Sequence, residues 1–173
     1  MPRALLLLLL IALPAWAGEA RTLEWPQLIP PGAPVIEPQM TPLHDLAQLS
    51  QLGDALAAEA APAAHQAVAD APVVKALDGQ QVKLPGYIVP LEVSEEGRTT
   101  EFLLVPYYGA CIHVPPPPSN QIVHVFSEIG IKVEELYQPY WIEGPMKVQS
   151  STSELASAGY QMEAEKIYAY ELQ

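Results

Sequence analysis

Hydrophobic and polar positions follow different patterns in the two halves of the chain. Before about residue 72, apolar residues occur in runs and at helical spacings, and prolines interrupt them repeatedly. After that point, β-branched and aromatic residues alternate with polar ones between turn signals. We therefore predict a mainly β domain over residues 72–173, preceded by an arm and helix over 18–71 and a signal peptide over 1–17.

The first residues have the three parts of a secretory signal peptide. Met1-Pro2-Arg3 supplies a basic start, an apolar run with six consecutive leucines follows, and Ala15 and Ala17 form a small-residue cleavage site. We predict cleavage after Ala17, because the apolar run is too short to span a bilayer. No cysteine stands directly after this site, and no later apolar stretch is long enough to cross a membrane. We therefore expect a periplasmic protein without a lipid anchor or a transmembrane segment.

Residues 18–42 are rich in proline, which interrupts helices and central strands, so they predict an extended arm. The arm has too many apolar residues for an inert linker, and we expect them to dock on the domain or on a partner: Leu23, Trp25, Leu28 and Ile29. A stripe of leucines at helical spacing then predicts a helix over 43–60. The alanine-rich residues 57–71 form either a second, weaker helix or a flexible spacer.

Five segments of the second half have the composition of β-strands: 81–92, 100–106, 121–126, 140–148 and 160–170. Pro85-Gly86 would break a flat central strand but suits one that coils sharply or carries a bulge. Residues 133–137 offer a short helix between the third and fourth strands. These elements predict an OB-like barrel, a small five-stranded fold. A generic small β-barrel or sandwich is the alternative, because strand number alone determines neither pairing nor register.

Composition and charge exclude several classes of protein. The chain is 50% hydrophobic, which is too apolar for a disordered protein. It has 8 Lys and Arg against 20 Asp and Glu, a net charge of -12, so we expect no binding of nucleic acid despite the OB-like pattern. The chain contains no Gly-rich phosphate loop, no H-E-x-x-H and no G-x-S-x-G. We therefore expect a non-catalytic protein, with an enzyme of unrecognised mechanism as the least favoured alternative.

Cys111 and His113 carry the most informative chemistry. If this segment is extended, the two side chains lie on one face and can bind one metal ion, zinc before copper. His124 on the third predicted strand is a candidate third ligand, and Met146 and Met162 would favour copper(I). Alternatively, the cysteine and both methionines are core residues. A redox role for the thiol is a further alternative, weakened by the lack of a second cysteine.

Four consecutive prolines follow these residues, and such a run adopts a rigid polyproline II conformation. Aromatic residues precede the run. We predict a docking surface for a membrane partner made of Tyr107, Tyr108, Pro115, Pro116, Pro117, Pro118 and Asn120. Such a surface would work without metal and is the alternative to the metal hypothesis.

Several segments resemble a family of exported bacterial proteins, the domain of unknown function family 3299. The similar segments are residues 23–30, 85–92, 101–118, 120–121, 141–144 and 158–162, of which Cys-Ile-His-Val-Pro-Pro-Pro-Pro is the most specific. The resemblance implies an envelope protein of Gram-negative bacteria, exported or lipid-anchored, although this chain lacks the lipobox of some relatives. It also implies an accessory role beside ABC-type transporter components linked to zinc supply, which favours the metal hypothesis for Cys111 and His113.

Overall fold

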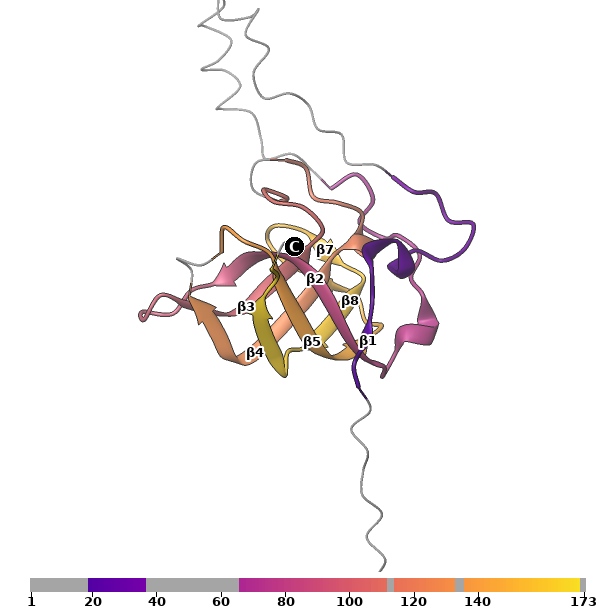
Figure 1. Ribbon diagram of the computed structural model, residues 1–173. Coiled ribbons are helices and arrows are strands. Elements are labelled where there is room, and N and C mark those ends of the chain that lie inside the picture. The colour runs from indigo at the N-terminus through magenta and orange to yellow at the C-terminus, as the bar shows by residue number, and fades with distance from the viewer. Residues whose placement is uncertain (1–18, 37–65, 112–113, 133–135, 172–173) are drawn as a thin grey trace, which may run out of the picture.

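The computed structural model describes residues 19–36, 66–111, 114–132 and 136–171. The described residues form short 3-10 helices and mostly β-structure (Figure 1). The elements are β1 (Arg21–Thr22), η1 (Trp25–Leu28), η3 (Lys75–Leu77), β2 (Gln81–Glu92), β3 (Arg98–Val105), η4 (Ser119–Gln121), β4 (Val123–Lys132), β5 (Tyr140–Lys147), β6 (Ser151–Thr152), β7 (Ser157–Ala158), β8 (Tyr160–Glu163) and β9 (Lys166–Ala169). None of the described helices has the length and apolar character needed to span a bilayer.

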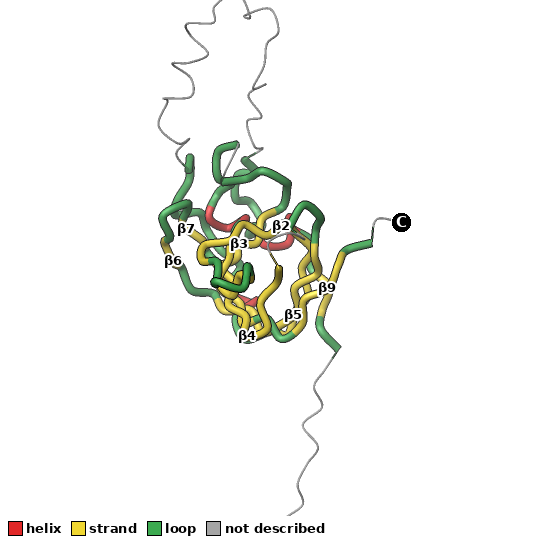
Figure 2. The backbone as a smooth tube through the Cα atoms, turned by 90° about the vertical axis from the view of Figure 1, so that its left-hand side faces the viewer, coloured by secondary structure: helices red, strands yellow, loops and turns green. Residues whose placement is uncertain are grey.

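Five strands close into a barrel, and Figure 2 shows them wrapped around a common centre. β2 pairs with β3 and β3 with β4, both antiparallel, and β4 runs parallel to β8. β8 then pairs antiparallel with β5, which returns to β2 and completes the circuit. This topology confirms the predicted mainly β, OB-like barrel.

β2 coils and changes partner along its length, as its Pro85-Gly86 pair predicts. Residues 81–86 pair with β5, whereas residues 87–92 pair with β3. A Cβ atom at Gly86 would lie 2.8 Å from the carbonyl oxygen of Val105, so only glycine permits this close approach of the two strands. The coil lets one strand belong to both sides of the barrel.

The apolar residues form two clusters, one on each face of the sheet. The larger cluster fills the barrel and includes Phe102, Met146, Tyr160 and Met162, all fully buried. A smaller cluster covers the opposite face of β2 and β3, where β7 packs on it: Val89, Leu103, Val105, Ala110, Ile122, Ala156 and Ala158. The core placement of Met146 and Met162 favours the structural interpretation of these residues over copper ligation.

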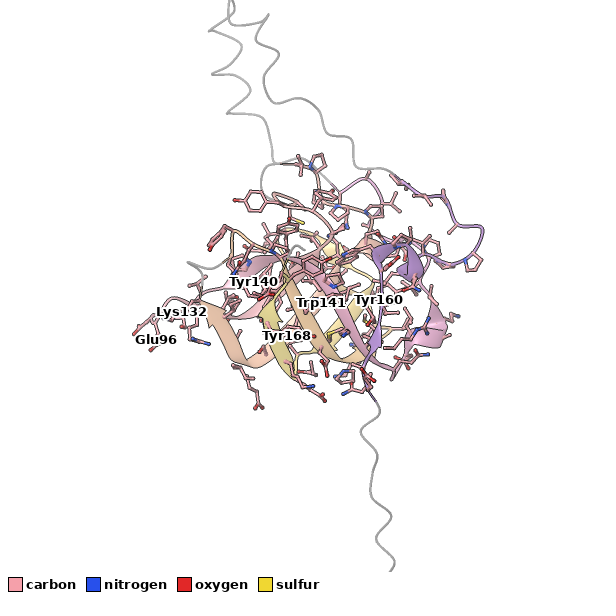
Figure 3. The ribbon with its side chains drawn as sticks, viewed as in Figure 1. Glu96, Lys132, Tyr140, Trp141, Tyr160 and Tyr168 are labelled. Carbon is pink, nitrogen blue, oxygen red and sulfur yellow. The ribbon has the colours of Figure 1, made fainter. Side chains whose placement is uncertain are left out.

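The N-terminal arm is part of the folded unit, as its apolar residues predict. β1 lies parallel to β2, and Leu23 and Leu28 are fully buried in the larger cluster. The indole Nε1 of Trp25 donates a hydrogen bond to the carbonyl of Pro85 at 2.7 Å. Tyr160 on β8 lies beside the arm, and its hydroxyl donates to the carbonyl of Leu28 at 2.7 Å (Figure 3).

Other predictions differ from the structure in part. The third predicted strand extends to Lys132, and the last one divides into β8 and β9. The helix over 43–60 lies outside the described residues, and residues 66–71 contain no helix. Of the short helix over 133–137, only Leu136 and Tyr137 are described, and they form a turn.

Candidate docking site

Four segments that are distant in the sequence enclose an apolar pocket of about 210 Å³. The lining residues are Ile29, Pro34, Val35, Ile36, Val68, Ala71, Pro72, Pro106, Tyr107, Pro117, Pro118, Asn120 and Gln121. None of these side chains is charged, and only the tyrosine and the two amides are polar. The pocket therefore suits an uncharged, largely apolar group.

Hydrogen bonds around η4 bring two of these segments together. The Ser119 amide donates to the carbonyl of Val68 at 3.0 Å, and the Ser119 hydroxyl accepts from the amide of Ala71 at 2.8 Å. The side chain of Asn120 donates to the carbonyl of Pro72 at 2.8 Å. Ser119 and Asn120 are both buried, so these bonds satisfy groups that water cannot reach. Asn120 thus positions one wall of the pocket.

The tetraproline packs into the protein and supplies part of the pocket wall. Pro116, Pro117 and Pro118 are buried, whereas Pro115 is half-buried. Pro117 and Pro118 line the pocket. The rigid polyproline conformation holds these rings in place without needing backbone hydrogen bonds of its own. Most of the tetraproline is therefore buried and does not form an exposed rod.

The two tyrosines before the tetraproline lie in different surroundings. Tyr107 is half-buried and lines the pocket, and its hydroxyl donates to the carbonyl of Pro115 at 3.3 Å. Burial, and secondarily the nearby Cys111, raises the pKa of Tyr107. Tyr108 is 63% exposed and packs edge-to-face on Tyr87, with ring centroids 5.8 Å apart. Of this pair, only Tyr107 belongs to the pocket.

The rim of the pocket includes residues that sequence reasoning missed. Val35 is 73% exposed and Ile36 is 37% exposed, although both side chains are large and apolar. They continue the arm beyond Ile29, which was among the predicted docking residues. Val68 also lines the pocket but lies in a stretch whose alanine content predicted only a weak helix or a spacer. No local pattern indicates that these residues converge.

Cys111 occupies an unusual backbone conformation. Its φ of 66° makes it the only non-glycine residue in the left-handed region within the described ranges. A tight loop accounts for this, since the Cys111 amide donates to Val114 and the Val114 amide donates to Gly109. The thiol packs against the smaller cluster, and burial raises its pKa to about 11. His113 lies outside the described residues, so the predicted pairing of Cys111 with His113 stays a prediction.

His124 is held by hydrogen bonds at both ring nitrogens. Nε2 lies 2.9 Å from Oε1 of Glu101, and Nδ1 lies 2.9 Å from Oγ of Ser151. The ring also packs on Phe126, with centroids 4.4 Å apart. A metal ion would have to replace one of the two hydrogen bonds. In the described part of the chain, no three His, Cys, Asp or Glu side chains are grouped so that they could hold a metal.

The fold defines a small OB-like barrel, and an apolar pocket lies at its junction with the N-terminal arm. The family model of a protein of unknown function, DUF3299, matches residues 25–169, and the chain belongs to this family. A crystal structure of a DUF3299 family protein (PA4066) from Pseudomonas aeruginosa PAO1 is similar, with 60% identity and a TM-score of 0.75. The match covers 90% of this chain and 99% of that one. No curated protein matches the chain.

Proposed function

We propose that this protein is an exported accessory component of an ABC-type envelope transport system, and that it binds a membrane partner through the apolar pocket. The observation that carries the proposal is the pocket itself, which is uncharged and is bordered by the exposed side chains of Val35 and Ile36. Exposed apolar side chains beside a preformed cavity are typical of a binding site. The predicted signal peptide and the family resemblance support the export and transport parts of the proposal.

The chemistry of the pocket defines the segment that it would accept. Burial of an aliphatic or proline side chain would be favourable there because the lining offers apolar surface and no charge to be desolvated. The net charge of -12 favours a partner segment with basic residues outside this apolar anchor. We therefore expect an extended periplasmic segment of a membrane protein, apolar at its centre and basic at its flanks.

Site-specific photocrosslinking in a Gram-negative host tests this proposal. A photoreactive phenylalanine analogue at Val35 should give a crosslinked product with a membrane protein in the envelope fraction. The matched control places the same analogue at Val93, which is 53% exposed and does not line the pocket. Equal products from both positions, or no product at Val35, would contradict the proposal.

Charge substitution at the same two positions provides an independent test. Val35→Glu should abolish the crosslink formed from an analogue at Ile36, which also lines the pocket, because the bound partner would then have to bury a carboxylate. Val93→Glu should leave it intact. Both substitutions lie on exposed side chains, so the free energy of unfolding should change by less than about 0.5 kcal/mol.

Metal binding at Cys111 and His113 is the second candidate function. The strained backbone at Cys111 favours it, since such conformations gather at functional sites. Mass spectrometry of protein purified from the periplasm without chelators should then find near-stoichiometric zinc, or copper as the second choice, that is lost in Cys111→Ser. Metal-free protein would remove this candidate and leave the docking proposal unaffected.

A further inference from the structure

Glu101, His124 and Ser151 form a linked array on the outer face of the barrel. They come from β3, β4 and β6, three elements brought together only by the fold. His124 pairs across the strands with Leu103, and Glu101 pairs with Phe126, which places Glu101 diagonally opposite the histidine on the same face. None of the three residues lines the apolar pocket.

The two hydrogen bonds determine the tautomer of the neutral histidine. An ionised carboxylate only accepts hydrogen bonds, so the 2.9 Å contact with Glu101 places the ring proton on Nε2. Nδ1 then carries a lone pair, and it lies 2.9 Å from Oγ of Ser151. The serine hydroxyl therefore donates to a nitrogen that can accept its proton.

Acid, histidine and serine are linked in the order found in serine hydrolases, with the two ring nitrogens exchanged, since here the serine contacts Nδ1 and the acid contacts Nε2. From it we infer that Ser151 is a nucleophile activated by His124, and that the protein hydrolyses carboxylic esters. Glu101 acts as a positioning residue that holds the imidazole. The inference goes beyond the proposed docking function, which requires no reaction, and departs from the sequence-based expectation of a non-catalytic protein.

Solvent reaches the array although the histidine is protected. The side chain of His124 is 8% exposed, that of Glu101 is 33% exposed, and Ser151 is half-buried. The Phe126 ring beside His124 offers an apolar contact for an acyl group. Gln161 is the register partner of His124 on β8, so its side chain lies on the same face of the sheet, and its amide would be the donor to the developing oxyanion.

The reaction balances with water as the second reactant. Oγ of Ser151 bonds to the ester carbonyl carbon while its proton passes to Nδ1 of His124. The proton then moves to the departing alcohol as the ester C–O bond breaks. Water, deprotonated by the same nitrogen, cleaves the acyl-serine, and the proton returns to Oγ as the acid leaves.

Active-site labelling of the purified mature protein tests the inference directly. A fluorophosphonate should phosphonylate Ser151 with loss of fluoride, and mass mapping should place the adduct on this residue. An unmodified protein, or an adduct on another residue, would overturn the inference. This measurement uses the wild-type protein and does not depend on a variant that folds.

Hydrolysis of p-nitrophenyl acetate supplies the kinetic test. Ser151→Ala should lower the rate at least about tenfold, to the background of the buffer, whereas the exposed neighbour changed in Ser150→Ala should match the wild type. Glu101→Gln should lower kcat with KM unchanged, because the carboxylate acts through the histidine. Equal rates for Ser151→Ala and Ser150→Ala would show a purely structural array. Neither substitution at Ser151 nor substitution at Glu101 should change crosslinking from Val35. The docking proposal and the hydrolase inference can therefore fail independently of each other.

Discussion

Tyr160 joins three parts of the molecule through one hydroxyl group. The side chain is fully buried in the barrel core. Its hydroxyl accepts a hydrogen bond from the amide of Val74 and donates one to the carbonyl of Leu28, both at 2.7 Å. Burial raises the pKa of this phenol, so the proton that it donates stays in place at neutral pH. One atom thus connects β8 with the arm and with the segment before η3.

Tyr160→Phe should therefore lower the free energy of unfolding by about 2 to 4 kcal/mol, because two backbone groups would lose their partner. Urea denaturation followed by circular dichroism measures this difference. Tyr168→Phe is the matched control, since Tyr168 is 40% exposed and should change stability by less than about 0.5 kcal/mol. Similar midpoints for both variants would show that the buried hydroxyl contributes little.

The thiol of Cys111 should react slowly in metal-free native protein. Burial raises its pKa from 9.0 to about 11, so about 100-fold less thiolate is present near pH 8 than for a free cysteine. Alkylation by iodoacetamide with a chelator present, followed by mass spectrometry, measures the rate. Native protein should react far more slowly than urea-denatured protein, and equal rates would contradict the burial of the thiol.

The same shift has a consequence for stability at high pH. The folded protein holds the thiol proton more tightly than the unfolded chain does. Its contribution to stability is therefore complete below about pH 9 and is lost as the pH rises through about 11. A bound metal ion would have to offset the cost of forming the thiolate in this buried position, which is why Cys111→Ser discriminates between the two candidate functions.

At the scale of elements, the described part of the arm belongs to the folded unit and is not a linker. Leu28→Ala should lower the free energy of unfolding by about 2 to 5 kcal/mol, because its side chain is fully buried in the barrel cluster. Val93→Ala should change it by less than about 0.5 kcal/mol. Chemical denaturation of both variants checks this, and a stability loss at Leu28 no larger than that at Val93 would show that the arm is dispensable.

The local sequence pattern was sufficient to predict the strands that keep the same partners along their length, and the strand in which a Pro-Gly pair marks a bend. The predicted strand over 81–92 has the observed bounds of β2, and Pro85-Gly86 marks its coil. Five alternating segments also led to the OB-like barrel. The sequence carries this information where buried positions alternate with more exposed ones, as in β5 and the first part of β2, because the alternation then specifies which residues point inward.

The change of partner within the last predicted strand left no local signal. The last predicted strand divides because the amide of Ala164 bonds to Phe126 on β4, whereas the next amide, of Glu165, bonds to Glu143 on β5. The backbone can pass there only because Gly144 has no Cβ to collide with the carbonyl of Glu163. This close approach of two backbone segments depends on residues about twenty positions apart in the sequence, so a local pattern does not reveal it.

In the candidate sites too, residues in one local segment were predicted and residues brought together from distant segments were not. Tyr107, Pro117, Pro118 and Asn120 were predicted from local composition, and they line the pocket. Val35 and Val68 complete it through packing between distant segments. No sequence pattern indicated a role for Ser151. Its contact with His124 joins β4 to a strand of two residues, which is too short to show any periodicity. Convergence of this kind is a property of the tertiary structure.

At the scale of the whole molecule, topology and charge point to different ligands. OB barrels commonly bind single-stranded nucleic acid through stacking aromatic residues and a basic track. Aromatic residues are present on the outside, since Trp141 packs on Tyr170 with centroids 5.2 Å apart and lies beneath Lys83 at 5.4 Å. Lys166 pairs with Glu143 and Lys147 with Glu163, so acidic residues neutralise neighbouring cations. Aromatic surface without a basic track does not attract a polyanion.

The protein should therefore fail to bind single-stranded DNA even at low salt, where electrostatic attraction is strongest. Fluorescence anisotropy of a labelled oligonucleotide should stay constant as protein is added, because the net charge of -12 repels the phosphates. An OB-fold protein known to bind single strands serves as the positive control. Saturable binding that weakens with added salt would contradict the prediction and would mean that local arrangement of the few cations outweighs the net charge. Constant anisotropy would leave the apolar pocket and the Ser151 array as the surfaces on which ligands should be sought.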